Sequence, residues 1–491
     1  MDFPAITIQE PAARMDPQGP DDILLHHIVA RIEKNRQQYR QQRQDPGTYT
    51  ICPFPDFLVG IDDRIQSPKL ASFGPRHRGK DHLLPFEKHK DDFLSKFLSR
   101  TESLGRDSRF YAQKLIEIKD NTKTCYSAKI VMPPDDELVH MMLLDGSFMV
   151  ELFREYEEEG RQVTWPWHVQ TLIADLLKLE NQLPFFLLEV LFNWSNIGQG
   201  ASIRTLPELA LRFLNQAFCW PSDMVNSQIQ HPKHLLDLFR LSLLPSTKTD
   251  PPQQSKHHPL VHSIQSVKEL RSTGITVRKN IAKSLLEIDF RKFQIPPLAL
   301  KIPPVAIDEF TNTILVNCVA LEQCLPDQSK HFTAYVCFMN CLMKQPEDVG
   351  FLRSVDIITR VSQDERYIID LLNSLGRYVS FSVRDCYLWR QLWDIHSYYN
   401  SSWASIRRNL FSYNNIMLYC SILQVTRTGV QCDIFGSELI NQSLQPWEAD
   451  FAEIDCFEVA TTVEFMFGSI RRYGVASLWL DLGEWVCEST Q

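Results

Sequence analysis

Apolar residues recur at intervals of three and four along most of the chain, the spacing that places them on one face of an α-helix. In residues 85–100, for example, Phe86, Phe93, Leu94 and Phe97 share one side. Similar patterns, many of them bounded by Pro, Gly or Asp, predict further helices at residues 21–43, 135–159, 168–192, 206–217, 232–244, 263–271, 308–324, 331–344, 347–354, 365–380 and 384–410. Strand-like pieces occur around residues 284–307. The pattern predicts a mainly α protein with minor β elements.

Composition divides the chain of 491 residues into three parts. Residues 1–44 begin Pro-rich and then contain one amphipathic helix, which indicates a flexible N-terminal extension. Residues 45–412 carry the other predicted helices, with a polar, proline-bearing surface loop at about 246–259. Residues 413–491 form a divergent tail with eleven acidic and three basic residues. No repeat of fixed period is present, so we expect one large helical domain between the two extensions.

Charge and hydropathy exclude several classes of protein. The net charge is −9, of which the tail holds −8, so the body lacks the concentrated basic face of a nucleic-acid-binding protein. The first residues lack the basic and apolar regions of a secretory signal. No stretch reaches the ~18 apolar residues that a membrane-spanning helix needs. We therefore expect a cytoplasmic or peripheral membrane protein.

The cysteines give no sign of a metal site. Twelve are scattered along the chain without a C-x-x-C pair, although Cys337 and Cys341 lie one helical turn apart, with Cys318 and Cys324 nearby. We interpret them as reduced, buried thiols. The sequence thus predicts no bound metal and no cofactor.

Three acidic residues interrupt apolar helix faces. Asp145 falls within the apolar stripe of residues 135–159, Glu180 follows apolar residues of the 168–192 segment, and Glu322 stands one turn after Cys318. A buried carboxylate must be hydrogen-bonded or paired with a cation, because burying it alone is costly. These three are candidate catalytic residues for acid–base or metal-dependent chemistry. The alternative is that they anchor helix ends or buried cations.

The stretch "GPRHRGKD", residues 74–81, resembles a phosphate-binding loop. Gly74, Gly79 and Lys80 fit G-x-x-x-x-G-K, but Asp81 replaces the Ser or Thr that would hold magnesium, and Pro75 removes a backbone donor. A nucleotide site is therefore not expected. The loop remains a candidate anion-binding site or a solvated entry to the next helix, through Arg76, His77, Arg78 and Lys80.

Longer motifs resemble a known plant family, domain of unknown function 247, also called uncharacterised protein family 0481. They span about residues 45–412 and include "SFGPRHRGKDHLLPFEKHKDDFLSKFLSR", "MMLLDGSFMVELFREY", "DLLKLENQLPFFLLEVLF", "IPPVAIDEFTNTILVNCVALEQC" and "LWDIHSYYNSSWASIRRNLF". The resemblance implies a plant protein without an established catalytic activity. Members typically carry a C-terminal membrane helix, which the acidic tail replaces here, and some are associated with self-incompatibility in grasses.

Two functions follow as hypotheses. The first is a non-enzymatic interaction or signalling protein that binds an unknown protein partner and associates with a membrane through its family relationship or through that partner. The absence of a recognisable nucleophile–base pair, metal cluster or cofactor loop favours it. The second is a hydrolase or metal-dependent enzyme that uses the three carboxylates.

Overall fold

The computed structural model describes residue 31 and residues 49–410 apart from short gaps, at 59–62, 103–104, 161–164, 166, 197–203, 218–228, 230, 246–263, 283, 291–297, 326–328, 360–364 and 379–385. The predicted helix at 21–43, the predicted loop at 246–259 and the tail at 413–491 lie outside the described residues. The division of the chain into three parts stays a prediction.

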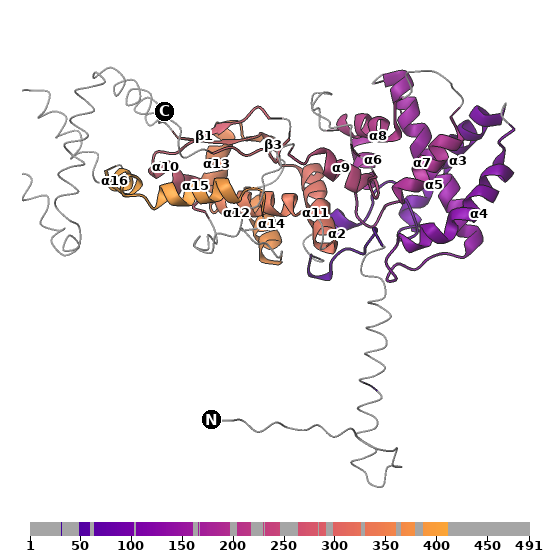
Figure 1. The fold of residues 1–491 in the computed structure, drawn as a ribbon, viewed down its shortest axis with the longest axis horizontal. Coiled ribbons are helices and arrows are strands. Elements are labelled where there is room, and N and C mark those ends of the chain that lie inside the picture. The colour runs from indigo at the N-terminus through magenta and orange to yellow at the C-terminus, as the bar shows by residue number, and fades with distance from the viewer. Residues whose placement is uncertain are drawn as a thin grey trace, which may run out of the picture. The chain divides into compact units, whose positions relative to one another are not determined.

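The described residues are mainly helical with a few short strands, as predicted (Figure 1). The first part contains η1 (Asp56–Leu58), α2 (Asp63–Gln66), η2 (Asp81–Leu83), α3 (Leu84–Thr101), α4 (Ser108–Thr124), α5 (Asp135–Glu159), α6 (Val169–Leu176), α7 (Phe185–Trp194), α8 (Leu206–Asn215) and α9 (Leu235–Ser242). The second part contains α10 (Val267–Ser272), β1 (Thr276–Lys279), β2 (Ala299–Ile302), β3 (Val305–Ala306), α11 (Glu309–Cys324), α12 (His331–Leu342), α13 (Pro346–Ser354), β4 (Ile358–Thr359), α14 (Glu365–Tyr378), α15 (Trp389–Tyr399) and α16 (Ser402–Leu410). Within these residues no helix is both long enough and apolar enough to cross a bilayer.

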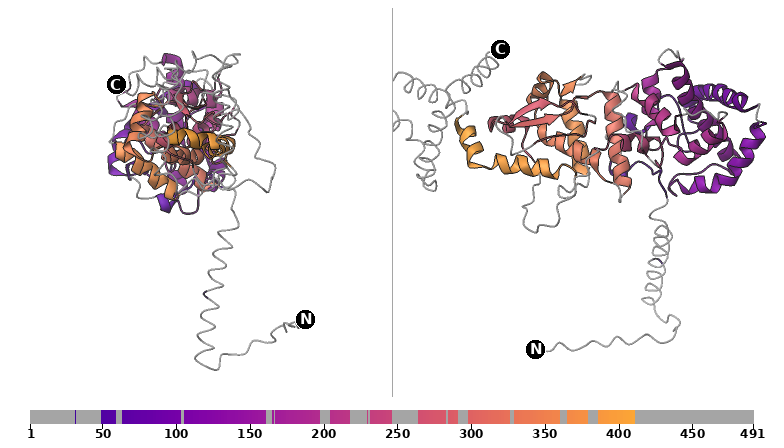
Figure 2. Two further views of the ribbon diagram at one scale, coloured as in Figure 1. Left: turned by 90° about the vertical axis from the view of Figure 1, so that its left-hand side faces the viewer. Right: turned by 45° about the horizontal axis from the view of Figure 1, so that its top comes forward.

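Helix α5 is the centre of the first part. It packs against α3, α4, α7 and α8, and the views of Figures 1 and 2 show these helices gathered around it. All residues from Met141 to Arg154 are buried, so this stretch has no solvent-facing side. A Cβ atom on Gly146 would lie 2.4 Å from Leu191 Cδ1, which explains the glycine at the crossing with α7.

The second part is organised around α11 and α12. Helix α11 packs against α2, α6, α9 and α12, and α12 packs against α14. Two small parallel sheets accompany these helices. Strand β1 pairs with β2 with Val277 opposite Leu300, and β3 pairs with β4 with Val305 opposite Ile358.

Side-chain caps explain where several helices begin. Asp107 accepts a hydrogen bond from the amide of Phe110 (2.9 Å) at the start of α4, and Asp308 accepts one from the amide of Thr311 (2.8 Å) at the start of α11. An acceptor at this position satisfies one of the amides that the first turn leaves unpaired.

Two long predicted helices are wrong as single elements. The 168–192 segment forms α6 and α7, separated by residues 177–184, whose polar side chains bind backbone groups elsewhere and which end in Pro184. The 384–410 segment forms α15 and α16, because Ser401 interrupts the pattern and accepts a hydrogen bond from the amide of Ala404 (3.3 Å) at the start of α16.

Other elements were not predicted. Helix α4 was missed, and strands β1 and β4 lie outside the stretch 284–307 expected to carry the β structure. Both strands are short and pair with segments distant in sequence. Local alternation therefore gives little signal for them.

Candidate functional site

Asp145 on α5 is almost fully buried and holds the start of the 74–81 loop. Its Oδ2 accepts a hydrogen bond from the amide of Gly74 (2.9 Å), and its Oδ1 accepts one from Lys90 Nζ (2.8 Å). Lys90 on α3 is fully buried as well, lies 2.7 Å from Glu87 Oε1 and donates to the Ser72 carbonyl (2.5 Å). A buried ion pair thus fixes the backbone on both sides of Phe73.

Glu180 holds the same loop from the other side. Its Oε1 accepts a hydrogen bond from the amide of Phe54 (3.1 Å) and lies 3.3 Å from Arg76 Nε. Its Oε2 lies 3.9 Å from His77 Nε2. Glu180 therefore joins the segment before α2 to the basic loop.

Glu322, near the end of α11, anchors a different element. Its two carboxylate oxygens accept hydrogen bonds from the amides of Phe332 (3.0 Å) and Thr333 (2.8 Å) in the first turn of α12. Burial raises the pKa of Glu322, while these hydrogen bonds act in the opposite direction. The carboxylate caps α12.

The structure brings Asp145 and Glu180 to one loop and Glu322 to another helix. Among the described residues, no hydrogen bond or ion pair found connects two of these three carboxylates. The same residues contain no group of three or more His, Cys, Asp or Glu side chains that could hold a metal ion. A catalytic role for the three stays a prediction, whereas their anchoring contacts are observed.

Sequence reasoning singled out Glu180 but missed its neighbours in "DLLKLENQ". We call the buried side chains of Asp175, Lys178, Glu180, Asn181 and Gln182 the polar clamp. Asp175 accepts hydrogen bonds from three successive amides (3.0, 2.6 and 3.1 Å), those of residues 69–71. Asn181 accepts one from the amide of Phe73 (2.7 Å). The available signal was that five of these eight residues are polar, between two strongly apolar stretches.

The remaining clamp residues extend these contacts. Lys178 donates to the carbonyls of Arg64 and Ser67, and Gln182 accepts a hydrogen bond from the amide of Leu236 (3.2 Å) on α9. Burial raises the pKa of Asp175 and lowers that of Lys178, and the opposite charge of each acts against the shift of the other. The clamp supplies hydrogen bonds to a segment that has little secondary structure of its own.

Gly74 explains why the loop is not arranged as a phosphate cradle. Its φ is +74°, and a Cβ atom there would lie 2.5 Å from the Gln182 carbonyl oxygen, so only glycine fits. Its amide, which a phosphate would need, is bound by the carboxylate of Asp145. The Asp145 carboxylate therefore binds the amide that a phosphate would otherwise bind.

The basic residues of the loop differ in exposure. The side chain of Arg76 is 47% exposed, whereas that of Arg78 is 19% exposed, with Nε 3.4 Å from Glu137 Oε1. His77 is buried, and burial together with the nearby Lys80 and Arg76 charges lowers its pKa to about 3. His77 is therefore neutral near neutral pH, and its Nδ1 lies 2.8 Å from Lys80 Nζ. These contacts fix the conformation of the loop, so it is not a fully solvated entry to α3.

A surface hollow of about 400 Å³ adjoins these residues. One wall is the basic loop, with Pro75, Arg76, Arg78 and Gly79, and the other is formed by residues 131–134 and Glu137. Val131 in the second wall is 85% exposed. The hollow combines two guanidinium groups with an exposed apolar rim. We take it, with the loop, as the candidate functional site.

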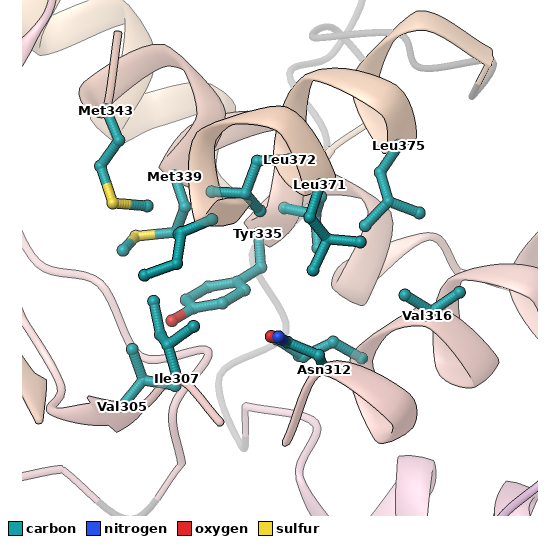
Figure 3. A pocket seen from close by; sticks show the side chains of 13 residues that line it. Val305, Ile307, Asn312, Val316, Tyr335, Met339, Met343, Leu371, Leu372 and Leu375 are labelled. Carbon is teal, nitrogen blue, oxygen red and sulfur yellow. The ribbon is translucent and has the colours of Figure 1, made fainter. Parts of the chain in front are cut away.

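A second, smaller cavity lies in the other part of the domain (Figure 3). Its volume is about 20 Å³, and it is lined mainly by apolar side chains from β3, α11, α12 and α14. Tyr335 and Asn312 also line it. The Tyr335 hydroxyl and the Asn312 amide nitrogen are buried and find no hydrogen-bond partner among the described residues.

We expect Tyr335→Phe to leave the free energy of unfolding unchanged or to raise it by about 1 kcal/mol, because it removes a buried hydroxyl that gains no hydrogen bond. Tyr111→Phe is the matched control, since that hydroxyl donates to Thr101 Oγ1 (3.2 Å), and it should lower stability by about 1 kcal/mol. Urea unfolding of both variants measures the difference. Equal losses would contradict the assignment of Tyr335.

The fold and the site define a helical domain in which buried polar side chains hold an extended segment and a basic loop beside a surface hollow. The family model described as plant protein of unknown function, DUF247, matches residues 51–424. The chain belongs to this family, and the resemblance drawn from its motifs is confirmed.

Two curated relatives extend this comparison. UPF0481 protein At3g47200 of Arabidopsis thaliana is 30% identical over 404 residues, covering 75% of this chain and 82% of the relative. Putative UPF0481 protein At3g02645 of the same plant is 20% identical over 458 residues, covering 72% of this chain and 83% of the relative. No solved structure matches the chain significantly.

Proposed function

We propose that this chain is a non-enzymatic plant interaction protein with a signalling role, which binds an acidic protein partner through loop 74–81 and the adjoining hollow. The observation that carries the proposal is that the clamp holds the loop rigidly from within while the Arg76 side chain stays half exposed at the hollow. Arginines on a preorganised surface are frequent anchors of protein interfaces.

The contacts of the candidate catalytic residues support a non-enzymatic role. Asp145 is engaged by Lys90 and Gly74, Glu180 by Phe54 and Arg76, and Glu322 by the start of α12. A general acid or base needs a face open to substrate. Each of these carboxylates instead accepts a hydrogen bond from a backbone amide of the protein, and Asp145 and Glu180 also pair with a basic side chain.

The chemistry of the hollow supports an acidic protein as the partner. The exposed Arg76 favours a carboxylate, and bidentate Arg–carboxylate pairing adds orientation. The opposite wall offers Val131 and two consecutive prolines to apolar side chains. A volume of about 400 Å³ accommodates one or two side chains of a partner.

Association with a membrane is part of this proposal. The family relationship supports association with a membrane. Binding to a partner that is itself at the membrane is the way in which a peripheral protein would be attached. Alkaline carbonate washing of membranes from plant cells that express the tagged chain tests it. Release by carbonate supports attachment through a partner, resistance means insertion into the bilayer, and recovery in the soluble fraction alone contradicts the membrane part of the proposal.

The interaction surface is tested by substituting the two arginines that line the hollow. We expect Arg76→Gln combined with Arg78→Gln to remove specific partners from affinity purifications compared by quantitative mass spectrometry. Arg109→Gln, an exposed arginine on α4, is the matched control and should keep them. An identical set of partners for the double variant and the control would contradict the assignment of this surface.

Glu180→Gln distinguishes the structural role from the enzymatic alternative. We expect it to lower the free energy of unfolding by about 1–3 kcal/mol, because the neutral amide weakens the hydrogen bond to Phe54 and the ion pair with Arg76. Thermal or urea unfolding measures the loss. A variant with unchanged stability that abolishes the biological readout would favour the enzyme instead.

A further inference from the structure

Two cysteines far apart in the sequence come together near the basic loop. Cys52 precedes η1 and Cys324 is the last residue of α11. The Cys324 thiol lies 3.6 Å from the carbonyl oxygen of Pro53, the residue after Cys52, and Cys324 is the neighbouring group with the largest effect on the pKa of Cys52. Neither is in a disulfide.

The fold holds the Cys52 side of this pair in place. Ile51 pairs with Tyr126 in an isolated bridge, and the amide of Phe54 is bound by Glu180 of the polar clamp. Cys52 therefore sits between two tertiary attachments. Cys324 is held by α11, whose neighbouring residues are buried in the core. Two cysteines whose backbone segments are held beside each other need little movement to form a disulfide.

The surroundings of the two sulfur atoms differ. The neighbouring Cys324 and the charge of Lys233 lower the pKa of Cys52, against the effect of burial. The neighbouring Cys52, burial and the negative charge of Glu180 raise the pKa of Cys324. These directions favour Cys52 over Cys324 as the thiolate of the pair. Cys324 is also the more exposed of the two, while Cys52 is 3% exposed.

We propose that Cys52 and Cys324 are a redox site that closes to a reversible disulfide when the protein meets a peroxide. The Cys52 thiolate attacks one oxygen of hydrogen peroxide, the O–O bond breaks, and the released hydroxide takes up a proton to leave as water, so that Cys52 becomes a sulfenic acid. The Cys324 sulfur then attacks the Cys52 sulfur, the S–O bond breaks, and the Cys324 proton leaves with the hydroxyl as a second water. Two thiols and one peroxide give one disulfide and two waters.

The consequence lies in what the new bond would connect. It joins the segment before η1, which Glu180 ties to the basic loop, to the end of α11. A disulfide there would restrain the segment that carries Phe54, and so would restrict the movement of Glu180 and of the loop residue Arg76 that it contacts. This inference goes beyond the proposed interaction and does not depend on it.

Other described cysteines are poorer partners for each other. Cys337 and Cys341 lie on the same helix, where Cβ atoms one turn apart are about 5–6 Å from each other, farther than the ~3.8 Å typical of a disulfide. Cys125 must be excluded as an alternative disulfide partner of Cys52. Its backbone carbonyl accepts hydrogen bonds from the amides of Thr50 and Ile51, which places it near Cys52.

The test uses the purified full chain, freshly reduced and desalted, then exposed to equimolar hydrogen peroxide and quenched with N-ethylmaleimide. Peptide mapping by mass spectrometry should find residues 52 and 324 in one cross-linked peptide, more abundant than any other disulfide peptide and lost on adding dithiothreitol. Cys52→Ser and Cys324→Ser should each abolish it, and Cys125→Ser should leave it unchanged.

Mapping the natural sequence decides the question even where a serine variant folds poorly. A dominant link from Cys52 to Cys125, a sulfinic acid on Cys52 with Cys324 still alkylated by N-ethylmaleimide, or cross-links spread evenly over the twelve cysteines would each overturn the proposal.

Discussion

Replacing Lys90 by methionine is expected to lower the free energy of unfolding by about 3–5 kcal/mol, the usual cost of leaving one member of a buried ion pair without its partner. Methionine is nearly as long as lysine, so the loss reports charge and hydrogen bonding more than packing. Asp145 would keep one hydrogen bond, from Gly74, but would carry an uncompensated charge in the core. Urea denaturation followed by circular dichroism measures the change.

Lys88→Met is the matched control, because Lys88 lies on the same helix but is exposed, and it should change stability by less than about 0.5 kcal/mol. Combining Lys90→Met with Asp145→Asn removes the orphaned charge and should recover part of the loss. Similar stabilities of the Lys88 and Lys90 variants would show that the buried pair contributes nothing.

Stability is expected to fall steeply as the pH drops from 6.5 towards 5, because three histidines are held neutral in the folded protein. The pKa of His77 is lowered to about 3 and those of His234 and His331 to about 4, in each case mainly by burial. Below pH 6.5 the unfolded chain binds protons that the folded protein does not, so the free energy of unfolding decreases with decreasing pH. Each fully effective histidine contributes about 1.4 kcal/mol per pH unit.

Urea unfolding at pH 7, 6 and 5 measures this slope. Asp175 and Glu322, whose pKa values burial raises, act in the opposite direction at lower pH, because the folded protein then binds their protons first. The slope of the free energy of unfolding with pH is therefore compared only above about pH 5. His77→Asn, whose side-chain oxygen can replace Nδ1 as a neighbour of Lys80, should reduce the slope; a stability that is flat from pH 7 to pH 5 would contradict the assignment.

The sequence predicted helices best where burial is one-sided. The 85–100 pattern gave α3 within one residue at each end, since its phenylalanines face the core and most of its charged residues, though not Lys90, face water. The 168–192 pattern gave one helix where there are two. Apolar residues recur across residues 177–184, but the polar residues there and Pro184 mark the break, and the tertiary hydrogen bonds of Asn181 and Gln182 hold it open.

The same distinction applies to the candidate site. Asp145 and Glu180 were identified because a carboxylate on an apolar face needs a partner, and both have one. Lys90 and Asp175 were missed, although they are buried more completely than Glu180. Lys90 stands among other charged residues and so resembles part of a solvated face, and nothing local to Asp175 shows that the amides it binds lie about 105 residues earlier.

The polar clamp also constrains how the protein can fold. Residues 69–74 are outside the helices and strands, yet their amides are bound by Asp175, Asn181 and Asp145. These acceptors come from segments about 70–110 residues later, so the stretch cannot acquire its hydrogen bonds until α5 and the residues after α6 are in place. Its amide protons should exchange with solvent as slowly as those of a core helix. This stretch, which lies outside the helices and strands, would thus be among the last to form and, once formed, among the slowest to open.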